Sequence, residues 1–372
     1  MPERPALIVV GASARALAAS ARHGGFAPLA IDVFGDDDTR ALSAAFARLE
    51  GGLAQGLNEA ALMAAIESMA AAHDPLGIVY GSGFDDRPEL VAAMAQRLRV
   101  FGNTSATMTR VKNPLILAQI CADHGIWHPE VMLSAPEDQT GWLMKKRGGA
   151  GGGHISIARQ RSTSMPEHYF QRQVGGDNCS ALFIADGKNA EMIGLSAQWA
   201  APTRAQPFRY GGAVGPIALA APMIEKILGA ITSLTRRFGL VGLNSADFLI
   251  DGEDAWLIEI NARPGATLDI FDSPGNPLIV RHVAACDGRL APYSADPLIK
   301  AARIVYAPSA MTTRDRIEWP DWSADRPVPG APISAGDPLC TVFATGPTVE
   351  FARSCVEERA RRIIALVENA AA

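Results

Sequence analysis

Short apolar segments and helical segments alternate along the first hundred residues of the chain. The segment ALIVV, residues 6–10, is apolar throughout, as a strand buried on both faces requires. Further elements are expected as strands at residues 27–34 and 77–83 and as helices at residues 16–22, 60–72 and 87–98. Strands separated by helices form a parallel sheet with right-handed crossovers. Residues 1–110 are therefore predicted to be a doubly wound α/β domain.

A sheet of this kind raises the alternative of a nicotinamide dinucleotide site after the first strand. Such a site needs the pattern G-x-G-x-x-G, but here Gly11 is followed by Ala12, Ser13 and Ala14. Asp32, near the end of the second strand, fits a ribose contact or an ordinary strand end equally well. The missing glycines favour a platform domain over an oxidoreductase. A nicotinamide cofactor that changed the melting temperature would favour the oxidoreductase.

Composition narrows the class of protein further. At 372 residues the chain is long for one core, so two or three domains are expected. The net charge of −5 argues against a nucleic-acid surface, and no apolar run approaches the roughly 18–20 residues that span a bilayer. The apolar run near the N-terminus is too short for a signal peptide. The scattered cysteines, without a C-x-x-C pair, are typical of free thiols in a cytoplasmic protein.

A glycine-rich loop follows two lysines in LMKKRGGAGGGHISI, residues 143–157. Because glycine has no Cβ atom, the backbone there can adopt positive φ, and its N–H groups can approach a charged ligand closely. The lysines precede the glycines, whereas a Walker A loop has its lysine after them. Alternating residues after the glycines indicate a strand. The pattern predicts a hairpin loop that covers phosphates, with a mobile surface turn as the alternative.

A second hairpin carries a set of polar residues. SADFLI and AWLIEI alternate apolar and polar residues on either side of an Asp-Gly turn, which is typical of an antiparallel pair. Asp247 lies on the first strand, and Glu259 and Asn261, two residues apart, share a face of the second. Hard oxygen ligands of this kind suit Mg²⁺. Arg263 points the same way, where a cation would stabilise developing negative charge. The alternative is a solvated strand face that happens to be acidic.

The segment IEINARPG, residues 258–265, resembles the E-x-N-x-R-x-[GS] element of the ATP-grasp superfamily, ligases related to biotin carboxylase. Asp247 matches the acidic residue that this family has about twelve positions earlier. The lysine-then-glycine loop resembles the family's phosphate lid, and the resemblance covers nearly the whole chain. It implies a pre-ATP-grasp α/β domain, an α+β ATP-grasp domain with a lid lobe, and a small C-terminal β-rich lobe with a final helix. The implied boundaries are residues 1–110, 111–300 (lid lobe about 125–185) and 301–372.

The same resemblance implies the roles of individual residues. Asp247, Glu259 and Asn261 would hold Mg²⁺ or Mn²⁺, and Arg263 would be the catalytic residue. ATP would bind Lys112, Lys145, Lys146, Gly149, Gly151, Gly152, Gly153, Gln171, Arg172 and Val174. Which of the two adjacent lysines faces ATP is left open, because the family usually has proline or alanine in the second position. The last three residues belong to YFQRQV, which resembles the hinge that contacts adenine, although Arg172 and Gln173 replace the usual acidic and aromatic residues.

The implied reaction activates a carboxylic acid as an acyl phosphate and joins it to an amine, with ADP as a product. Arg204, Arg209, Tyr210 and Thr267 border the expected acceptor pocket, although arginines in loops are as often merely solvated. The chain also resembles carboligases found with methanofuran and methanopterin pathways, including a tyramine–glutamate ligase. Small-molecule substrates and a homodimer are the expected partners, without nucleic acid or membrane. A nucleotide sensor without turnover is the alternative.

Overall fold

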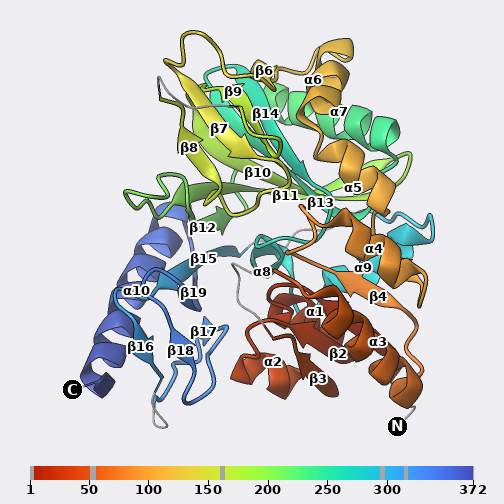
Figure 1. Ribbon diagram of the computed structural model, residues 1–372, viewed down its shortest axis with the longest axis vertical. Helices are drawn as coiled ribbons and strands as arrows, with labels where there is room; N and C mark the ends of the chain where they lie inside the picture. The colour runs from red at the N-terminus through yellow and green to blue at the C-terminus, as the bar shows by residue number, and fades with distance from the viewer. Residues whose placement is uncertain (1–3, 51–55, 160–163, 294–297, 314–316, 372) are drawn as a thin grey trace.

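The computed structural model describes residues 4–50, 56–159, 164–293, 298–313 and 317–371 (Figure 1). These residues form a five-stranded parallel sheet, a four-stranded antiparallel sheet and an eight-stranded antiparallel sheet, with a further pair of short strands near the C-terminus. Within these ranges, no helix is long and apolar enough to cross a membrane.

The N-terminal domain is the doubly wound parallel sheet that the sequence predicts. Its strand order is β3-β2-β1-β4-β5, so the order reverses between β1 and β4. The strands are β1 (Ala6–Val10), β2 (Ala27–Asp32), β3 (Ala45–Arg48), β4 (Ile78–Tyr80) and β5 (Val100–Phe101). The helices are α1 (Arg15–His23), α2 (Asp37–Leu42), α3 (Glu59–His73) and α4 (Pro88–Ala95). Sequence analysis missed β3, β5 and α2, because such short elements contain too few residues to establish a period.

The two faces of β1 pack against different helices. Ile8 and Val10 pack in one cluster with residues of α3 and α4, whereas Leu7 and Val9 pack with α1 and with α9 (Leu278–Cys286). A backbone hydrogen bond of 2.8 Å joins the turns that follow β1 and β4. In open α/β sheets, ligand sites lie at the carboxyl ends of the strands where the order reverses. These two turns are therefore at the edge where a site is expected.

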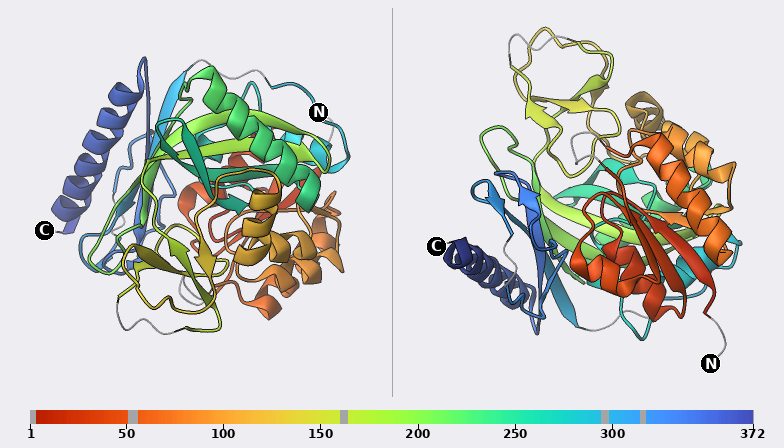
Figure 2. Two further views of the ribbon diagram at one scale, coloured as in Figure 1. Left: turned by 90° about the horizontal axis from the view of Figure 1, so that it is seen from above. Right: turned by 60° about the horizontal axis from the view of Figure 1, so that its bottom comes forward.

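The lid is a small sheet that projects from the rest of the molecule (Figure 2). Helices α5 (Ser105–Val111) and α6 (Pro114–Asp123) lead into it. Its strands, in the order β6-β9-β7-β8, are β6 (Val131–Met132), β7 (Trp142–Lys146), β8 (Ile155–Ile157) and β9 (His168–Arg172). The glycine-rich loop joins the antiparallel strands β7 and β8, which confirms the predicted hairpin. The lid sheet ends before the expected boundary near residue 185, because β10 (Asp177–Asp186) belongs to the large sheet.

The large sheet has the order β14-β13-β10-β11-β12-β15-β19-β17. Its other strands are β11 (Ala190–Ala200), β12 (Tyr210–Gly215), β13 (Val241–Asp251), β14 (Asp254–Asn261), β15 (Ile299–Tyr306), β17 (Ser323–Ala324) and β19 (Pro338–Gly346). The pairing of β13 with β14 confirms the second predicted hairpin. Helix α7 (Ala221–Phe238) packs on the sheet through buried residues at helical spacing, among them Ile227, Ile231 and Leu234.

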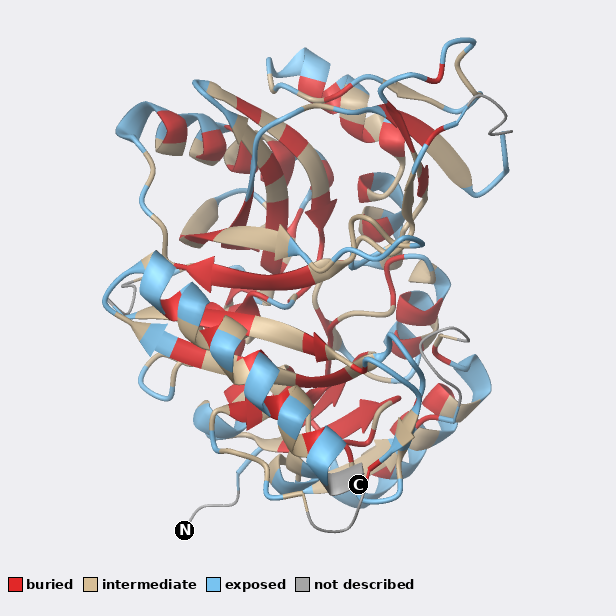
Figure 3. Cartoon of the chain, turned by 90° about the vertical axis from the view of Figure 1, so that its left-hand side faces the viewer, coloured by how far each residue is buried: buried red, intermediate tan, exposed pale blue. Residues whose placement is uncertain are grey.

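The C-terminal segment, which the sequence predicted as a small β-rich lobe with a final helix, extends the large sheet. Strand β15 pairs with β12, and β19 pairs with β15. Only β16 (Met311–Thr312) and β18 (Pro332–Ile333), among the described strands of this segment, form a pair of their own. Helix α10 (Val349–Ala371) covers β15 and β19 with one buried stripe and exposes its other side (Figure 3). The stripe contains Ala352, Val356, Ala360, Ile363 and Val367.

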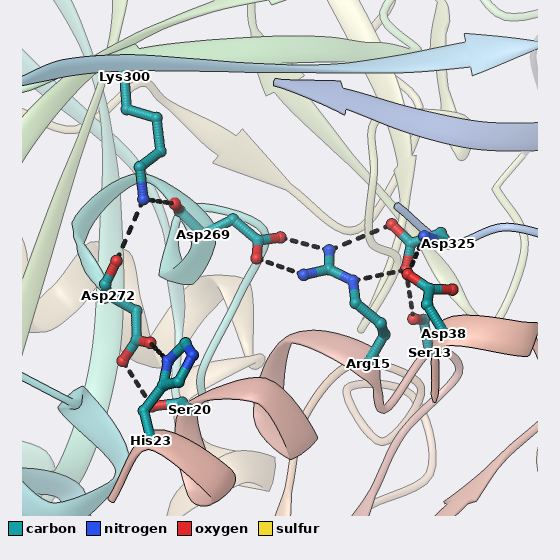
Figure 4. A network of polar contacts seen from close by, with 9 residues as sticks. All are labelled: Ser13, Arg15, Ser20, His23, Asp38, Asp269, Asp272, Lys300 and Asp325. Carbon is teal, nitrogen blue, oxygen red and sulfur yellow. Dashed lines mark hydrogen bonds and ion pairs between the residues drawn. The ribbon is translucent and has the colours of Figure 1, made fainter. Parts of the chain in front are cut away.

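A polar network joins the N-terminal domain, the segment that follows β14 and the C-terminal segment (Figure 4). Buried Arg15, at the start of α1, donates two hydrogen bonds of 2.5 and 2.6 Å to Asp269 on α8 (Leu268–Phe271). Arg15 also donates to Asp325 in the C-terminal segment, at 3.1 and 3.2 Å. Lys300 on β15 donates to the carbonyl oxygen of Asp269 at 2.8 Å. Because the Arg15 guanidinium binds one carboxylate from each of the other two segments, the network fixes the orientation of all three segments relative to one another.

Asp36, beside this network, should make stability depend on pH. The side chain is 5% exposed, and burial together with Asp325, Asp32 and Asp38 raises its pKa to about 8. The folded state therefore keeps a proton that the unfolded chain releases near pH 4, so the free energy of unfolding should fall as the pH rises from about 4 to about 8. Asp36→Asn should flatten this fall and raise the melting temperature most at the upper end of that range. Calorimetry over the range, with exposed Asp37→Asn as control, tests this; parallel curves for wild type and Asp36→Asn would refute it.

Candidate functional site

The hairpin of β13 and β14 brings three of the predicted site residues together. Asp247 lies opposite Glu259, and Ser245 lies opposite Asn261. The amide nitrogen of Asn261 is 3.0 Å from Oδ2 of Asp247 and 3.4 Å from Oε1 of Glu259. The register therefore places two carboxylates and an amide at one point on the face of the sheet.

Burial and charge set the protonation of the two carboxyl groups. Burial, followed by repulsion from Glu259, raises the pKa of Asp247, although Ser180 Oγ donates a 2.6 Å hydrogen bond to its carboxylate. For Glu259, burial acts to raise the pKa, but the positive charges of Lys112 and Lys145 outweigh burial. The pKa of Glu259 is therefore lowered. A cation bound between the two groups would remove their mutual repulsion.

The donor set fits Mg²⁺ after one side-chain rotation. Within the described ranges, no three His, Cys, Asp or Glu side chains are grouped to hold a metal, so the protein ligands of a metal at this point would be two carboxylates and one amide. Mg²⁺ commonly binds through one or two carboxylates, with substrate phosphates and water completing its shell. Asn261 turns its NH₂ group towards both carboxylates, while its Oδ1 accepts a 2.9 Å hydrogen bond from Lys112. Reversing the amide would direct its oxygen to the ion instead.

The two adjacent lysines of β7 point in different directions. Lys145 is 4% exposed, and burial lowers its pKa to about 8, although Glu259 and Asp247 act in the opposite sense. Lys146 is more exposed and forms a 2.8 Å ion pair with Asp86. Lys145 is therefore the lysine whose charge acts on the two carboxylates, whereas Lys146 lines the cavity between the lid and the hairpin, so which of the two faces ATP stays a prediction.

A small cavity lies between the lid and the hairpin. Its volume is about 30 Å³, whereas sites for small-molecule ligands typically have about 300–1,000 Å³. The lining includes Lys112, His128, Lys146, Gly148, Gly149, His154, Tyr169, Gln171 and Glu259. The lid is therefore closed, and a nucleotide could enter only after the lid moved away.

The glycine-rich loop makes close contacts that explain its composition. Gly148 has a φ of +67°, and a Cβ atom there would lie 2.4 Å from the carbonyl oxygen of Asp85. Gly152 has a φ of +71°, and its Cβ atom would lie 1.9 Å from the carbonyl oxygen of Phe208. Gly151 accepts a 2.9 Å hydrogen bond from the amide of Tyr210. The closed loop thus contacts both the N-terminal domain and the large sheet, so it is more than a surface turn.

Two histidines border the cavity although sequence analysis did not select them. Burial lowers the pKa of His154, and Glu259, the next influence, acts in the opposite sense. Burial lowers the pKa of His128 to about 4, so this ring is neutral near pH 7. The position of His154 directly after the glycines was the one available signal. Nothing in the sequence around His128 distinguished it from a residue at a helix end.

The predicted hinge residues have different surroundings. Gln171 is 2% exposed and lines the cavity. Arg172 instead donates to the carbonyl oxygen of Thr140 and lies over the Trp142 ring at 5.5 Å, on the exposed side of β9. Val174 is half-buried beyond the end of the strand. Of the three side chains, that of Gln171 is the one that borders the cavity.

Arg263 is 7% exposed and is held by the N-terminal domain. Its Nε lies 2.7 Å from Oδ2 of Asp85, and its Nη1 donates to the carbonyl oxygen of Pro264 at 3.2 Å. Asp85 also lies 3.4 Å from Nζ of Lys112, which in turn is 3.8 Å from Glu259. A chain of alternating charges therefore connects Arg263 to the acidic cluster. Sequence analysis missed Asp85, because its neighbours Phe84 and Asp86 form no recognisable motif with it.

The four predicted acceptor residues do not form one group. Arg204 is exposed. Arg209 stacks on Tyr306 at 3.6 Å and donates to two backbone carbonyl groups, which indicates a structural role. Burial and the carboxylates of Asp247 and Asp269 raise the pKa of Tyr210, so its hydroxyl belongs to the acidic region. Thr267 is buried before α8, four residues beyond Arg263. Tyr210 and Thr267 thus remain candidates for contact with the acceptor.

Residues 112–267 match the family model of the ATP-grasp domain. This range begins at Lys112, ends at Thr267 and contains the lid, the glycine-rich loop and the hairpin. A search of curated proteins finds no match to the chain.

Solved structures with a similar fold include two biotin carboxylases or their domains and an L-amino acid ligase. Biotin carboxylase from Campylobacter jejuni, in a complex with β-γ-ATP, is 13% identical, with a TM-score of 0.71 over 95% of this chain and 90% of the other. The biotin carboxylase domain dimer of 2-oxoglutarate carboxylase from Hydrogenobacter thermophilus, with MgADP and bicarbonate, is 13% identical (TM-score 0.70; 94% and 88% covered). L-amino acid ligase from Bacillus licheniformis is 14% identical (TM-score 0.67; 96% and 97% covered).

Proposed function

We propose that this chain, whose fold and whose residues 112–267 are those of an ATP-grasp protein, is a ligase that uses ATP to join a carboxylic acid to an amine. The observation that carries the proposal is the group of Asp247, Glu259, Asn261 and Lys112 beneath the glycine-rich loop, with Arg263 beside it. Two acidic ligands for Mg²⁺ together with buried cations are what phosphoryl transfer to a carboxylate requires.

In the first step, a carboxylate oxygen of the acid attacks the γ-phosphorus of ATP, the bond to the β-phosphate oxygen breaks, and ADP leaves. Lys112 and Lys145 would neutralise phosphate oxygens; with a pKa of about 8, Lys145 is mostly protonated near pH 7. Mg²⁺ bound by Asp247, Glu259 and Asn261 would supply further neutralisation. The closed loop would exclude water, which otherwise would hydrolyse the acyl phosphate.

In the second step, the amine nitrogen attacks the acyl carbon, and phosphate leaves with the oxygen that came from the acid. Arg263 would stabilise the negative charge of the acyl phosphate and of the tetrahedral intermediate. The amine loses a proton, and the amide is the product. The structural relatives support this scheme: one holds MgADP with bicarbonate, which is an acid of the carboxylate type, and the other is an L-amino acid ligase, whose name supports an amino acid as a substrate.

A screen for ADP release tests the proposal. Purified protein would receive MgATP, or MnATP, with pairs of acids and amines, including amino acids and pterin or furan precursors suggested by the resemblance to methanofuran-pathway carboligases. We expect one acid to raise ADP release, and one amine to raise it further with formation of an amide. ATP binding without ADP release for any pair would favour the nucleotide sensor.

The glycine-rich loop provides a second test, with a matched pair of variants. Gly151 and Gly152 have φ angles of +67° and +71°, so alanine at either position incurs a similar cost of about 1–2 kcal/mol. A Cβ atom at Gly152 would meet the Phe208 carbonyl oxygen, whereas one at Gly151 would meet nothing within 4 Å. Gly152→Ala should therefore prevent full closure and reduce turnover by on the order of 10²-fold, and Gly151→Ala should reduce it much less. Equal turnover of the two variants would mean that the closed loop has no part in the reaction.

A further inference from the structure

Asp85 carries a buried negative charge, although the proposed reaction does not use its carboxylate as a metal ligand. It follows β4, in the turn of the N-terminal domain that lies where the strand order reverses. The residue is 4% exposed. Its Oδ2 lies 2.7 Å from Arg263 Nε, and its Oδ1 lies 3.4 Å from Lys112 Nζ. One carboxylate thus lies between the two cations that are proposed to act on the phosphate and the acyl group.

The surroundings of Asp85 differ from those of the exposed ion pair formed by the residue that follows it. Oδ1 of Asp85 is buried and accepts no hydrogen bond from the described residues. Burial raises the pKa of Asp85, but Arg263 and Lys112 outweigh burial, and the group stays ionised. The next residue, Asp86, is exposed and pairs with Lys146. Two adjacent aspartates therefore differ sharply: one is a buried charge at the site and the other belongs to a surface ion pair.

The geometry around Arg263 explains what the buried charge does. Asp85 holds Nε, and the carbonyl oxygen of Pro264 holds Nη1, so the plane of the guanidinium is fixed at two points. A rigid, pre-oriented cation stabilises a transition state without reorganisation, and displacement by about 1 Å is enough to lose on the order of 10²-fold in rate. The same carboxylate also opposes the binding of anions, because it partly cancels the charges of Arg263 and Lys112.

We infer that Asp85 is a positioning residue, through which the N-terminal domain orients Arg263 and Lys112 for the reaction at the cost of weaker binding of the anionic nucleotide. This inference rests on the proposed function, because it assigns Asp85 to the same site. The inference predicts effects of opposite sign on nucleotide binding and on turnover. Loss of the charge should improve nucleotide binding and impair turnover, whereas loss of a purely structural contact would impair both.

The experiment compares Asp85→Asn with Asp86→Asn in the full chain. Asparagine preserves the shape of the side chain and removes its charge. For Asp85→Asn, we expect a MgATP dissociation constant lower than that of wild type by calorimetry, and a kcat lower by on the order of 10²-fold with the acid and amine identified in the screen. Asp86→Asn should change both quantities far less, because exposed ion pairs contribute little. Asp85→Glu, which keeps the charge but moves it, should return the dissociation constant towards the wild-type value while kcat stays low.

Weaker MgATP binding by a folded Asp85→Asn protein would overturn the inference, and so would an unchanged kcat or equal effects of Asp85→Asn and Asp86→Asn. If Asp85→Asn failed to fold, Asp85→Glu would decide: wild-type kcat in that variant would contradict precise positioning. Failure of the proposed function is distinguishable, since wild-type protein would then release no ADP in the screen. In that case the binding measurement alone would still refute the inference if Asp85→Asn did not bind MgATP more tightly.

Discussion

Replacing Glu259 with glutamine should abolish ADP formation while the protein remains folded. Glu259 is one of two carboxylates in the cluster, and glutamine has nearly the same shape without the charge that attracts Mg²⁺. The change also leaves the cations Lys112 and Lys145 with less compensation. We therefore expect ADP formation below detection at ordinary Mg²⁺ concentrations. The measurement is ADP release with the identified substrates, beside a thermal melt.

The control for this variant is Glu253→Gln, on the exposed turn of the same hairpin. It removes the same charge from the same supersecondary unit, but away from the cluster, and should retain turnover. Full activity of Glu259→Gln would exclude Glu259 as a metal ligand. Partial activity that recovers as the Mg²⁺ concentration rises would instead support metal binding, because the lost affinity is offset by mass action.

Replacing Arg263 with methionine should reduce product formation far more than it weakens ATP binding. A preorganised group that acts on developing charge typically contributes about 10²–10³ in kcat, or about 2.7–4 kcal/mol. Methionine retains much of the apolar volume and removes the guanidinium. ATP binding depends mainly on the adenine side, the lysines and Mg²⁺, so the dissociation constant for MgATP should rise by a much smaller factor than kcat falls. Calorimetry beside turnover measures both quantities.

The contact with Asp85 complicates this variant. Removing Arg263 leaves a buried carboxylate with Lys112 as its remaining partner among the described cations, and breaking a buried pair typically costs about 3–5 kcal/mol of stability. The double variant Arg263→Met with Asp85→Asn removes that cost and should recover stability but not turnover. Retained turnover in Arg263→Met would remove Arg263 from the mechanism. Equal loss of ATP binding and turnover would assign it to the nucleotide site instead.

The sequence was sufficient to predict the elements whose pattern is long or chemically specific. The apolar run of β1 and its neighbours predicted the parallel sheet, and the alternation around residues 251–252 predicted the hairpin of β13 and β14. The spacing of Glu259 and Asn261 placed them on one face, and the register then brought Asp247 beside them. These predictions succeeded because strand periodicity and a tight turn together determine which side chains face one another.

Features that depend on contacts between distant segments could not be predicted. Asp85 meets Arg263 across 178 positions of sequence, and no local pattern indicates that contact. The orientations of Lys145 and Lys146 follow from pairing within the lid sheet and from the approach of Asp86. The β-rich C-terminal lobe was predicted, but the pairing of its strand β15 with β12 of the large sheet was not, because the composition of a strand does not indicate its partner.

The most direct test of carboxylate activation follows an oxygen atom. The acid identified in the screen would be labelled with ¹⁸O in its carboxylate and incubated with MgATP, the amine and the enzyme. If an acyl phosphate forms, the attacking carboxylate oxygen becomes the bridge to phosphorus and leaves with the phosphate. We predict one ¹⁸O atom in each phosphate released and the loss of one ¹⁸O atom from the acyl group of each amide. Unlabelled phosphate, formed at the same rate as the amide, would contradict the account, because phosphate would then have obtained its oxygen from water.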